Sequence, residues 1–246
     1  MNLGLEGRVC VVTGGTRGIG AATARMLAQE GATVLSVSRH GADVELDVTA
    51  PDAGERLLGA CADPPWALVN NAGTSQARGL DDLADADWQE QWELHVMAPM
   101  RLMRALAPVM AEAGGGRIVN VSSSSGRRPS GRLDAAYSVT KAAELSLSRV
   151  FADAFAAKGV LVNAVTPGAI DGELWKEEGG LADQIAARTG KTRDEVLEST
   201  RSSPPLGRMG TAEEVAAVIA FLCSEHASNV AGAAWAVDGG VVPTID

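Results

Sequence analysis

The stretch RVCVVTGGTRGIG, residues 8–20, decides the fold of this chain. Its first half is a short run of β-branched and apolar residues, which is typical of a buried strand. Glycines follow, and from Ile19 to Glu30 apolar residues recur at helical spacing until Gly31 ends the segment. A strand that enters a helix through a glycine-rich turn predicts the opening unit of a parallel α/β sheet.

The rest of the chain repeats this alternation. Further strands are predicted at Thr33 to Ser38, Val44 to Val48, Ala67 to Asn70, Arg117 to Ser122, Val160 to Val165 and Ala233 to Val237. Further helices are predicted at Asp52 to Ala60, Asp87 to Glu112, Ala135 to Lys158 and Thr211 to Cys223. We therefore expect one domain, residues 1–246, with a Rossmann-type doubly wound parallel sheet and helices on both faces.

One region departs from this rhythm. The segment from Gly172 to Ser203 is highly charged and carries its own capping box, Thr192 followed by Glu195. We expect two short helices here, inserted before the last helix as a substrate loop.

The charge balance narrows the range of partners. The 246 residues contain 21 Lys and Arg against 31 Asp and Glu, a formal net charge of −10. This acidity argues against nucleic acid and anionic membranes. The longest apolar run, Val215 to Cys223, is about half of what a membrane-spanning helix needs. The start shows no signal sequence, and Cys10, Cys61 and Cys223 have no paired spacing, so we expect reduced thiols in a cytoplasmic protein.

The glycines after the first strand suit a phosphate ligand. Gly14, Gly18 and Gly20 let the backbone approach a pyrophosphate, and the following helix offers free N–H groups at the positive end of its dipole. Their spacing differs from the G-x-G-x-x-G dinucleotide fingerprint. A tight turn that only requires glycine is the alternative interpretation.

Polar residues gather where the strands end, which is where a sheet of this kind binds its ligand. Asp47 closes the third strand, Asn70 the fourth, and the serines at 122–125 the fifth. Tyr137 and Lys141 are four residues apart, so on a helix they share one face. An ammonium group beside a phenol favours the phenolate. Each residue has an ordinary structural explanation by itself, and only the combination points to catalysis.

The combined motifs resemble the short-chain dehydrogenase/reductase family along nearly the whole chain. The matching stretches are TGGTRGIG at 13–20, ELDVT at 45–49, NNAG at 70–73, IVNVSSSSG at 118–126, YSVTK at 137–141, VNAVTPG at 162–168, and LGRMGTAEEVAAVIAFLCSE followed by VDGG. Their order and spacing agree as well. The resemblance implies an oxidoreductase that transfers a hydride between a nicotinamide and a carbonyl or secondary alcohol.

The resemblance also assigns roles to residues. Ser123 would bond the substrate carbonyl, Tyr137 would be the general acid in reduction and the base in oxidation, and Lys141 would bond the nicotinamide ribose and favour ionisation of the tyrosine. Ser123 precedes Tyr137 by 14 residues, about one more than usual, so we expect one extra residue in the intervening loop. Cofactor contacts are implied for Gly14, Thr16, Arg17, Gly18, Ile19, Gly20, Ser38, Arg39, Asp47, Val48, Asn70, Ala72, Gly73, Tyr137, Lys141, Pro167, Gly168 and Ile170.

The end of the second strand predicts which nicotinamide cofactor binds. An acidic residue there bonds the ribose of NAD and repels the 2′-phosphate of NADP. Here Ser38 has that position and Arg39 follows, and an arginine can clamp a phosphate with two hydrogen bonds. Arg17 adds a second positive charge. We expect NADP(H), with NAD(H) as the alternative if Asp43 or Glu45 reaches the ribose.

Two positions depart from the family pattern. Gly172 replaces a threonine that usually contacts the cofactor, and His95 falls where the family has a catalytic asparagine. In relatives the backbone carbonyl of that asparagine holds a water linked to the lysine. Pro99 has no N–H, so in a helix it leaves the carbonyl of His95 free for such a water. An imidazole that titrates near neutrality would be a second contributor to this relay. A helix residue without a role is the alternative.

Substrate and assembly are less closely defined. The resemblance leaves 3-oxoacyl thioesters, polyketides, sugars, polyols, steroids and other small ketones as candidates. It implies that specificity is set by Gly172 to Ser203, including Trp175, and by residues 124–132. Arg127, Arg128 and Arg132 would meet an acidic substrate or remain solvated. The resemblance implies a homo-oligomer, a tetramer that pairs through its long helices and last strand.

Two other classes of function remain as alternatives. The first is a cofactor-binding protein without turnover. The second is metal-dependent chemistry, which we do not expect because His40, His95 and His226 have no ligand spacing with one another or with the cysteines.

Overall fold

A computed structural model describes residues 2–129 and 133–243, and within them seven strands form one parallel sheet in the order β3-β2-β1-β4-β5-β6-β7. The strands are β1 (Val9–Thr13), β2 (Thr33–Ser38), β3 (Val44–Glu45), β4 (Ala67–Asn70), β5 (Gly116–Val121), β6 (Val160–Pro167) and β7 (Ala234–Val237). The order reverses between β1 and β4, so neighbouring connections leave the sheet in opposite directions and open a crevice at the carboxyl ends of the strands. The predicted fold class is confirmed.

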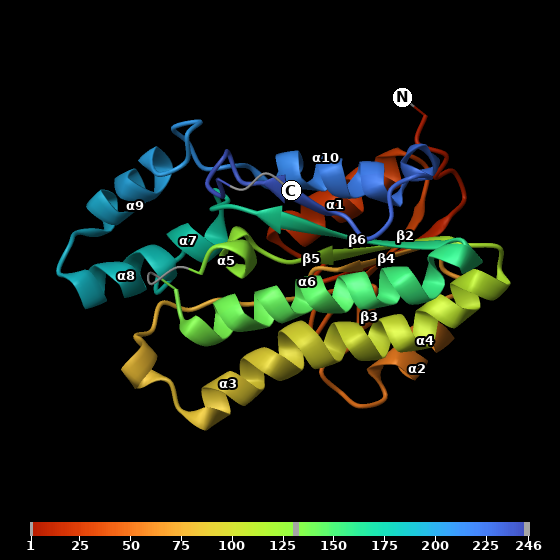
Figure 1. Cartoon of the computed structure of the whole chain (residues 1–246), viewed down its shortest axis with the longest axis horizontal. Helices are drawn as coiled ribbons and strands as arrows, with labels where there is room; N and C mark the ends of the chain where they lie inside the picture. The colour runs from red at the N-terminus through yellow and green to blue at the C-terminus, as the bar shows by residue number, and fades with distance from the viewer. Residues whose placement is uncertain (1, 130–132, 244–246) are drawn as a thin grey trace.

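Helices cover both faces of the sheet (Figure 1). They are α1 (Gly18–Gln29), α2 (Ala53–Ala60), α3 (Asp85–Trp92), α4 (Ala98–Glu112), α5 (Ser124–Arg127), α6 (Ala135–Phe155), α7 (Glu173–Lys176), α8 (Leu181–Thr189), α9 (Arg193–Ser202) and α10 (Ala212–Cys223). Short 3₁₀ or π segments are η1 (Leu80–Asp82), η2 (Glu93–Met97), η3 (Ala156–Lys158) and η4 (Glu225–Ala227).

Two apolar cores lie on either side of the sheet. Leu57 of α2, Leu102 of α4 and Ala152 of α6 pack against one face, and Leu27 of α1 and Ile219 of α10 pack against the other. Because both faces are covered, the central strands are buried throughout. This rigid sheet presents its strand ends to the crevice.

The structure corrects three details of the predicted elements. β3 ends at Glu45, short of the predicted Val48. The long predicted helix begins at Asp85 and passes through the π-helical η2 just before Pro99. A proline cannot donate to the preceding turn, and here a wider turn lies at that point. The serines after β5 form α5, an additional short helix.

The insertion contains three helices, α7, α8 and α9, where two were predicted, because the short α7 precedes the other two. They surround a third, small core that includes Trp175, Ile185 and Val196. In Figure 1 this unit lies at one end of the molecule, beside α5 and the strand ends. The insertion therefore borders the crevice, and its role as a substrate loop stays a prediction.

Candidate active site

A cavity of about 1160 Å³ opens at the carboxyl ends of the strands. Its wall includes Ser123, Tyr137 and Lys141, which come from two different elements. Most of the expected cofactor residues also line it: Gly14, Thr16, Arg17, Gly18, Ile19, Ser38, Arg39, Asp47, Val48, Ala72, Gly73, Pro167, Gly168 and Ile170. Three expected site residues do not line it: Gly20, Asn70 and His95.

The loop between β1 and α1 forms a cradle without side chains. Gly14 and Gly18 have φ of +63° and +53°, a region that strongly favours glycine. A Cβ at Gly18 would meet nothing, because that side of the residue faces open space. A Cβ at Gly20 would meet the Gly14 carbonyl oxygen. The loop backbone and the N-terminus of α1 therefore fit a pyrophosphate group.

An asparagine that was not among the expected site residues supports this loop. The Asn71 side chain donates to the carbonyl oxygens of Thr13 (2.9 Å) and Gly14 (3.2 Å). Its neighbour Asn70, an expected cofactor residue, instead donates to the Asn120 side chain at 2.8 Å and is buried. The pair of asparagines in the sequence was the available signal, but only the strand geometry shows which one faces the loop.

Two adjacent serines have different partners. The Ser122 hydroxyl donates to the Lys141 carbonyl at 2.8 Å, so it ties β5 to α6. The Ser123 hydroxyl oxygen accepts the Ser125 backbone N–H at 3.1 Å and caps α5. The capping bond uses a lone pair of the hydroxyl oxygen, so the Ser123 proton remains available to a ligand in the cavity.

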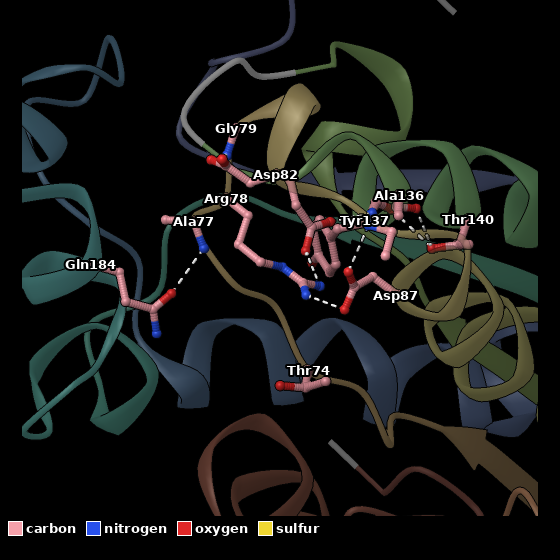
Figure 2. Close-up of polar contacts among 12 residues, drawn as sticks. Thr74, Ala77, Arg78, Gly79, Asp82, Asp87, Ala136, Tyr137, Thr140 and Gln184 are labelled. Atoms are coloured by element: carbon pink, nitrogen blue, oxygen red, sulfur yellow. Dashed lines mark hydrogen bonds and ion pairs between the residues drawn. The ribbon is translucent and has the colours of Figure 1, made fainter. Parts of the chain in front are cut away.

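A buried carboxylate places the start of α6. Asp134 is fully buried and accepts the backbone N–H of Tyr137 at 2.6 Å. Arg78 bonds both Asp134 (3.2 Å) and Asp87 (2.5 Å), as Figure 2 shows for Asp87. The same loop is tied to α8, because the Gln184 side chain accepts the Ala77 N–H at 2.9 Å. This network fixes Tyr137 relative to α3.

His95 lies directly behind Tyr137. The two rings meet edge to face, with centroids 5.5 Å apart. Thr140 donates its hydroxyl proton to a backbone carbonyl of the preceding turn, so it accepts from His95 Nδ1 at 3.0 Å. His95 Nε2 accepts the Thr74 backbone N–H at 3.3 Å. The hydrogen bonds therefore assign a neutral imidazole with its proton on Nδ1.

This environment corrects one part of the relay hypothesis. Burial, assisted by the Lys141 charge, holds the pKa of His95 well below its ordinary value. A ring that stays neutral and is bonded at both nitrogens does not titrate near neutrality. Pro99 lies at the start of α4 and lacks the N–H that would take the His95 carbonyl, so the carbonyl part of the hypothesis remains a prediction.

Lys141 is held by two buried partners. Its ammonium donates to the Val121 carbonyl and to Glu144, both at 2.8 Å. Glu144 is 2% exposed and lies on α6, one turn after the lysine. Sequence reasoning missed it, because a lone Glu in an Ala-rich helix is ordinarily a solvated residue.

The end of β2 presents no carboxylate to the cavity. Asp43 accepts from the Ser36 hydroxyl (2.6 Å) and backbone (3.0 Å), which lowers the pKa of Asp43. Glu45 accepts the Gly41 backbone N–H at 2.9 Å. Neither lines the cavity, whereas Ser38 and Arg39 do.

The arginines that follow the serines after β5 differ in whether they line the cavity. Arg127 donates to the Ala234 carbonyl at 2.6 Å, and Arg128 donates to the Val241 carbonyl at 3.2 Å and lines the cavity. Arg132 lies outside the described residues. Within residues 2–129 and 133–243, no cluster of His, Cys, Asp or Glu side chains is arranged to hold a metal ion, and no helix is long and apolar enough to cross a membrane.

The sequence model described as Enoyl-(Acyl carrier protein) reductase matches residues 14–242. The chain belongs to the short-chain dehydrogenase/reductase family. This short-chain dehydrogenase/reductase is similar in structure to L-sorbose reductase from Gluconobacter frateurii, solved with NADPH and L-sorbose, with 33% identity, a TM-score of 0.90 and all of both chains covered.

Two curated relatives show the same extent of similarity. The cis-4-hydroxycyclohexanecarboxylate dehydrogenase of Sinomonas cyclohexanicum is 37% identical over 95% of this chain and 96% of its own. The 3-oxoacyl-(acyl-carrier-protein) reductase FabG of Vibrio cholerae is 31% identical, with 97% and 99% covered. The family resemblance inferred from the motifs is thereby confirmed, and the chain is an oxidoreductase of this family.

Proposed function

We propose that this chain is an NADP(H)-dependent oxidoreductase that interconverts a small carbonyl compound and a secondary alcohol. The observation that carries the proposal is the convergence of Ser123, Tyr137 and Lys141 on one cavity beside the glycine cradle. The bound nicotinamide would supply or accept the hydride. The remaining tasks, orientation and proton transfer, fall to side chains of this chain.

Each of the three residues has a distinct task in this proposal. Ser123 donates a hydrogen bond to the substrate carbonyl, since its proton is not used by the bond that its oxygen accepts from the Ser125 N–H. Tyr137 gives its phenolic proton to the developing alkoxide in reduction and takes it back in oxidation. Lys141 lines the cavity and would hold the nicotinamide ribose.

A preference for NADP(H) follows from charge. Arg39 and Arg17 are exposed and line the cavity near the end of β2. The carboxylates that could select the unphosphorylated ribose, Asp43 and Glu45, are both engaged elsewhere. A 2′-phosphate beside Arg39 and Arg17 would therefore meet positive charge, with neither Asp43 nor Glu45 directed at it.

The substrate we propose is a small polar ketone or the corresponding alcohol. The outer cavity wall carries Gln76, Glu90, Arg128, Asp171 and Glu173, which are groups that bond hydroxyls or carbonyls. A relative that reduces L-sorbose and relatives named as 3-oxoacyl reductases support sugar-like and 3-oxoacyl compounds as first candidates.

The decisive assay follows NADPH absorbance with a panel of ketones that includes keto sugars and 3-oxoacyl thioesters. We expect NADPH consumption with at least one of them. Wild-type protein that binds NADPH but consumes none with any substrate, in either direction, would instead indicate a binding protein without turnover.

We further propose a cytoplasmic homotetramer. Val150 on α6 and Trp92 on α3 are exposed apolar side chains, and Trp235 lies on β7 at the edge of the sheet. Such residues suit contacts between copies of one chain. Light scattering should give about four chain masses, and a single-chain mass would contradict the tetramer.

A further inference from the structure

Glu144 is a buried carboxylate that the proposed reaction does not use. It does not line the cavity, and its carboxylate accepts from the ammonium of Lys141 at 2.8 Å. Lys141 in turn does line the cavity. Glu144 therefore lies behind the lysine, on the side away from a ligand.

The groups around Lys141 and Glu144 set the electrostatic environment of this pair. From β5 come the Val121 carbonyl, which accepts from Lys141, and the Ser122 hydroxyl, which donates to the Lys141 backbone. From η2 comes His95, whose hydrogen bonds assign a neutral ring. The pair is therefore flanked by neutral groups and by Tyr137, one turn earlier on α6.

The ionisation of Glu144 depends on two opposing effects. Burial raises the pKa of Glu144 to about 7, and the Lys141 charge acts in the opposite direction. At alkaline pH, where phenols ionise, Glu144 is a carboxylate. A buried carboxylate is costly unless paired, so its charge is directed at the ammonium.

We propose that Glu144 is a positioning residue that neutralises Lys141 and thereby keeps Tyr137 in the protonated form that donates to a carbonyl. The inference rests on the proposed function, because it concerns the direction in which the same site runs the reaction. A bare ammonium near a phenol stabilises the phenolate. A paired ammonium and carboxylate act as a dipole, which stabilises the phenolate much less. An ionised Glu144 therefore sets the site for reduction.

The size of the effect follows from helical geometry. Tyr137 and Glu144 are seven residues apart, two turns along one face of α6. A unit charge held in the protein interior at this spacing is only partly screened, so it acts on the phenol. Removing the carboxylate should therefore lower the ionisation midpoint of the phenol by on the order of one pH unit.

The chain contains a single tyrosine, so its ionisation can be read directly. The test is a pH titration of the near-ultraviolet absorbance of tyrosinate in wild type, Glu144→Gln and Asp153→Asn. Asp153 is a matched control, since it is an exposed carboxylate on the same helix, paired with Arg149 at 2.6 Å. We expect a lower midpoint by about one unit for Glu144→Gln and no change for Asp153→Asn. An unchanged or higher midpoint in Glu144→Gln overturns the proposal.

A second variant covers the case in which Glu144→Gln does not fold, since it leaves a buried ammonium unpaired. The double variant Lys141→Met with Glu144→Leu removes both charges together. If the pair is neutral toward the phenol, its midpoint stays close to wild type. A rise of on the order of one unit would mean that Lys141 acted alone and that Glu144 has no role.

The titration requires neither cofactor nor turnover, so it separates this inference from the proposed function. If the midpoint shifts but the protein reduces no ketone, the proposed function is rejected and the charge pairing is supported. If the protein reduces ketones but the midpoint does not shift, the charge pairing is rejected and the proposed function is supported.

Discussion

The acid stability of this protein should depend on one buried histidine. His95 is fully buried, and its pKa in the folded state is held well below the ordinary value of about 6.5. Unfolding returns the ring to water, where it binds a proton below that pH. The unfolded state then carries more protons than the folded state, so stability falls as the pH falls below about 6.5.

The magnitude follows from the linkage relation. Each pH unit below about 6.5 costs about 1.4 kcal/mol until the folded ring itself titrates, so the loss between pH 7.5 and about 5.5 is about 1.4 kcal/mol. Glu144 acts in the opposite direction in the same window. Its folded pKa of about 7 lies above the ordinary 4.5, so its contribution is present at acid pH and is lost as the pH rises through about 7.

Because these two effects oppose each other, only a comparison of variants isolates the histidine. We suggest urea unfolding of wild type and His95→Asn at several pH values from about 5.5 to about 8. The variant loses contacts with Thr140 and Thr74 at every pH, so its absolute stability is lower throughout. The difference between the two proteins should shrink by about 1.4 kcal/mol on going to acid pH. Two curves that run parallel over this range would refute the assignment of a neutral buried ring.

Three further predictions concern catalysis. Arg39→Asp should lower kcat/KM for NADPH by 10- to 100-fold, about 1.4–2.7 kcal/mol, and raise kcat/KM for NADH. Steady-state assays with both cofactors measure this, and a wild type that prefers NADH contradicts the charge argument. Tyr137→Phe should lower turnover by about 10²- to 10⁴-fold while the NADPH Kd from fluorescence titration stays within a few-fold, and activity within about tenfold of wild type would exclude the acid role. Pro99→Ala restores an N–H that can take the His95 carbonyl, so the solvent isotope effect on turnover should rise; an unchanged effect would argue against the carbonyl relay.

The fold could be predicted because its signals are local. The apolar β-branched run at residues 8–13 and the glycines after it predict a strand and a turn without reference to the rest of the chain. The predicted bounds of elements were wrong where the sequence pattern was weak or interrupted. The strand from Val44 has only two paired residues, and Pro99 interrupts a continuous apolar pattern.

The site could be predicted in part for the same reason. Tyr137 and Lys141 share a helix face by spacing alone, and the structure brings both to the cavity with Ser123. Which of two asparagines supports the glycine loop could not be predicted, because strands β1 and β4 pair in a register that the sequence does not display. Asn71 reaches the loop only through that register.

The sequence by itself determined the α/β alternation, the glycine cradle, the family and the three residues of the proposed reaction, since each depends on residue type and short-range spacing. Only the tertiary structure decided the charge state of the site. Burial of His95 and the pairing of Glu144 with Lys141 depend on how α6 packs against β5 and η2. Ionisation follows from desolvation and from charges brought together by folding, and neither is written in the order of residues along the chain.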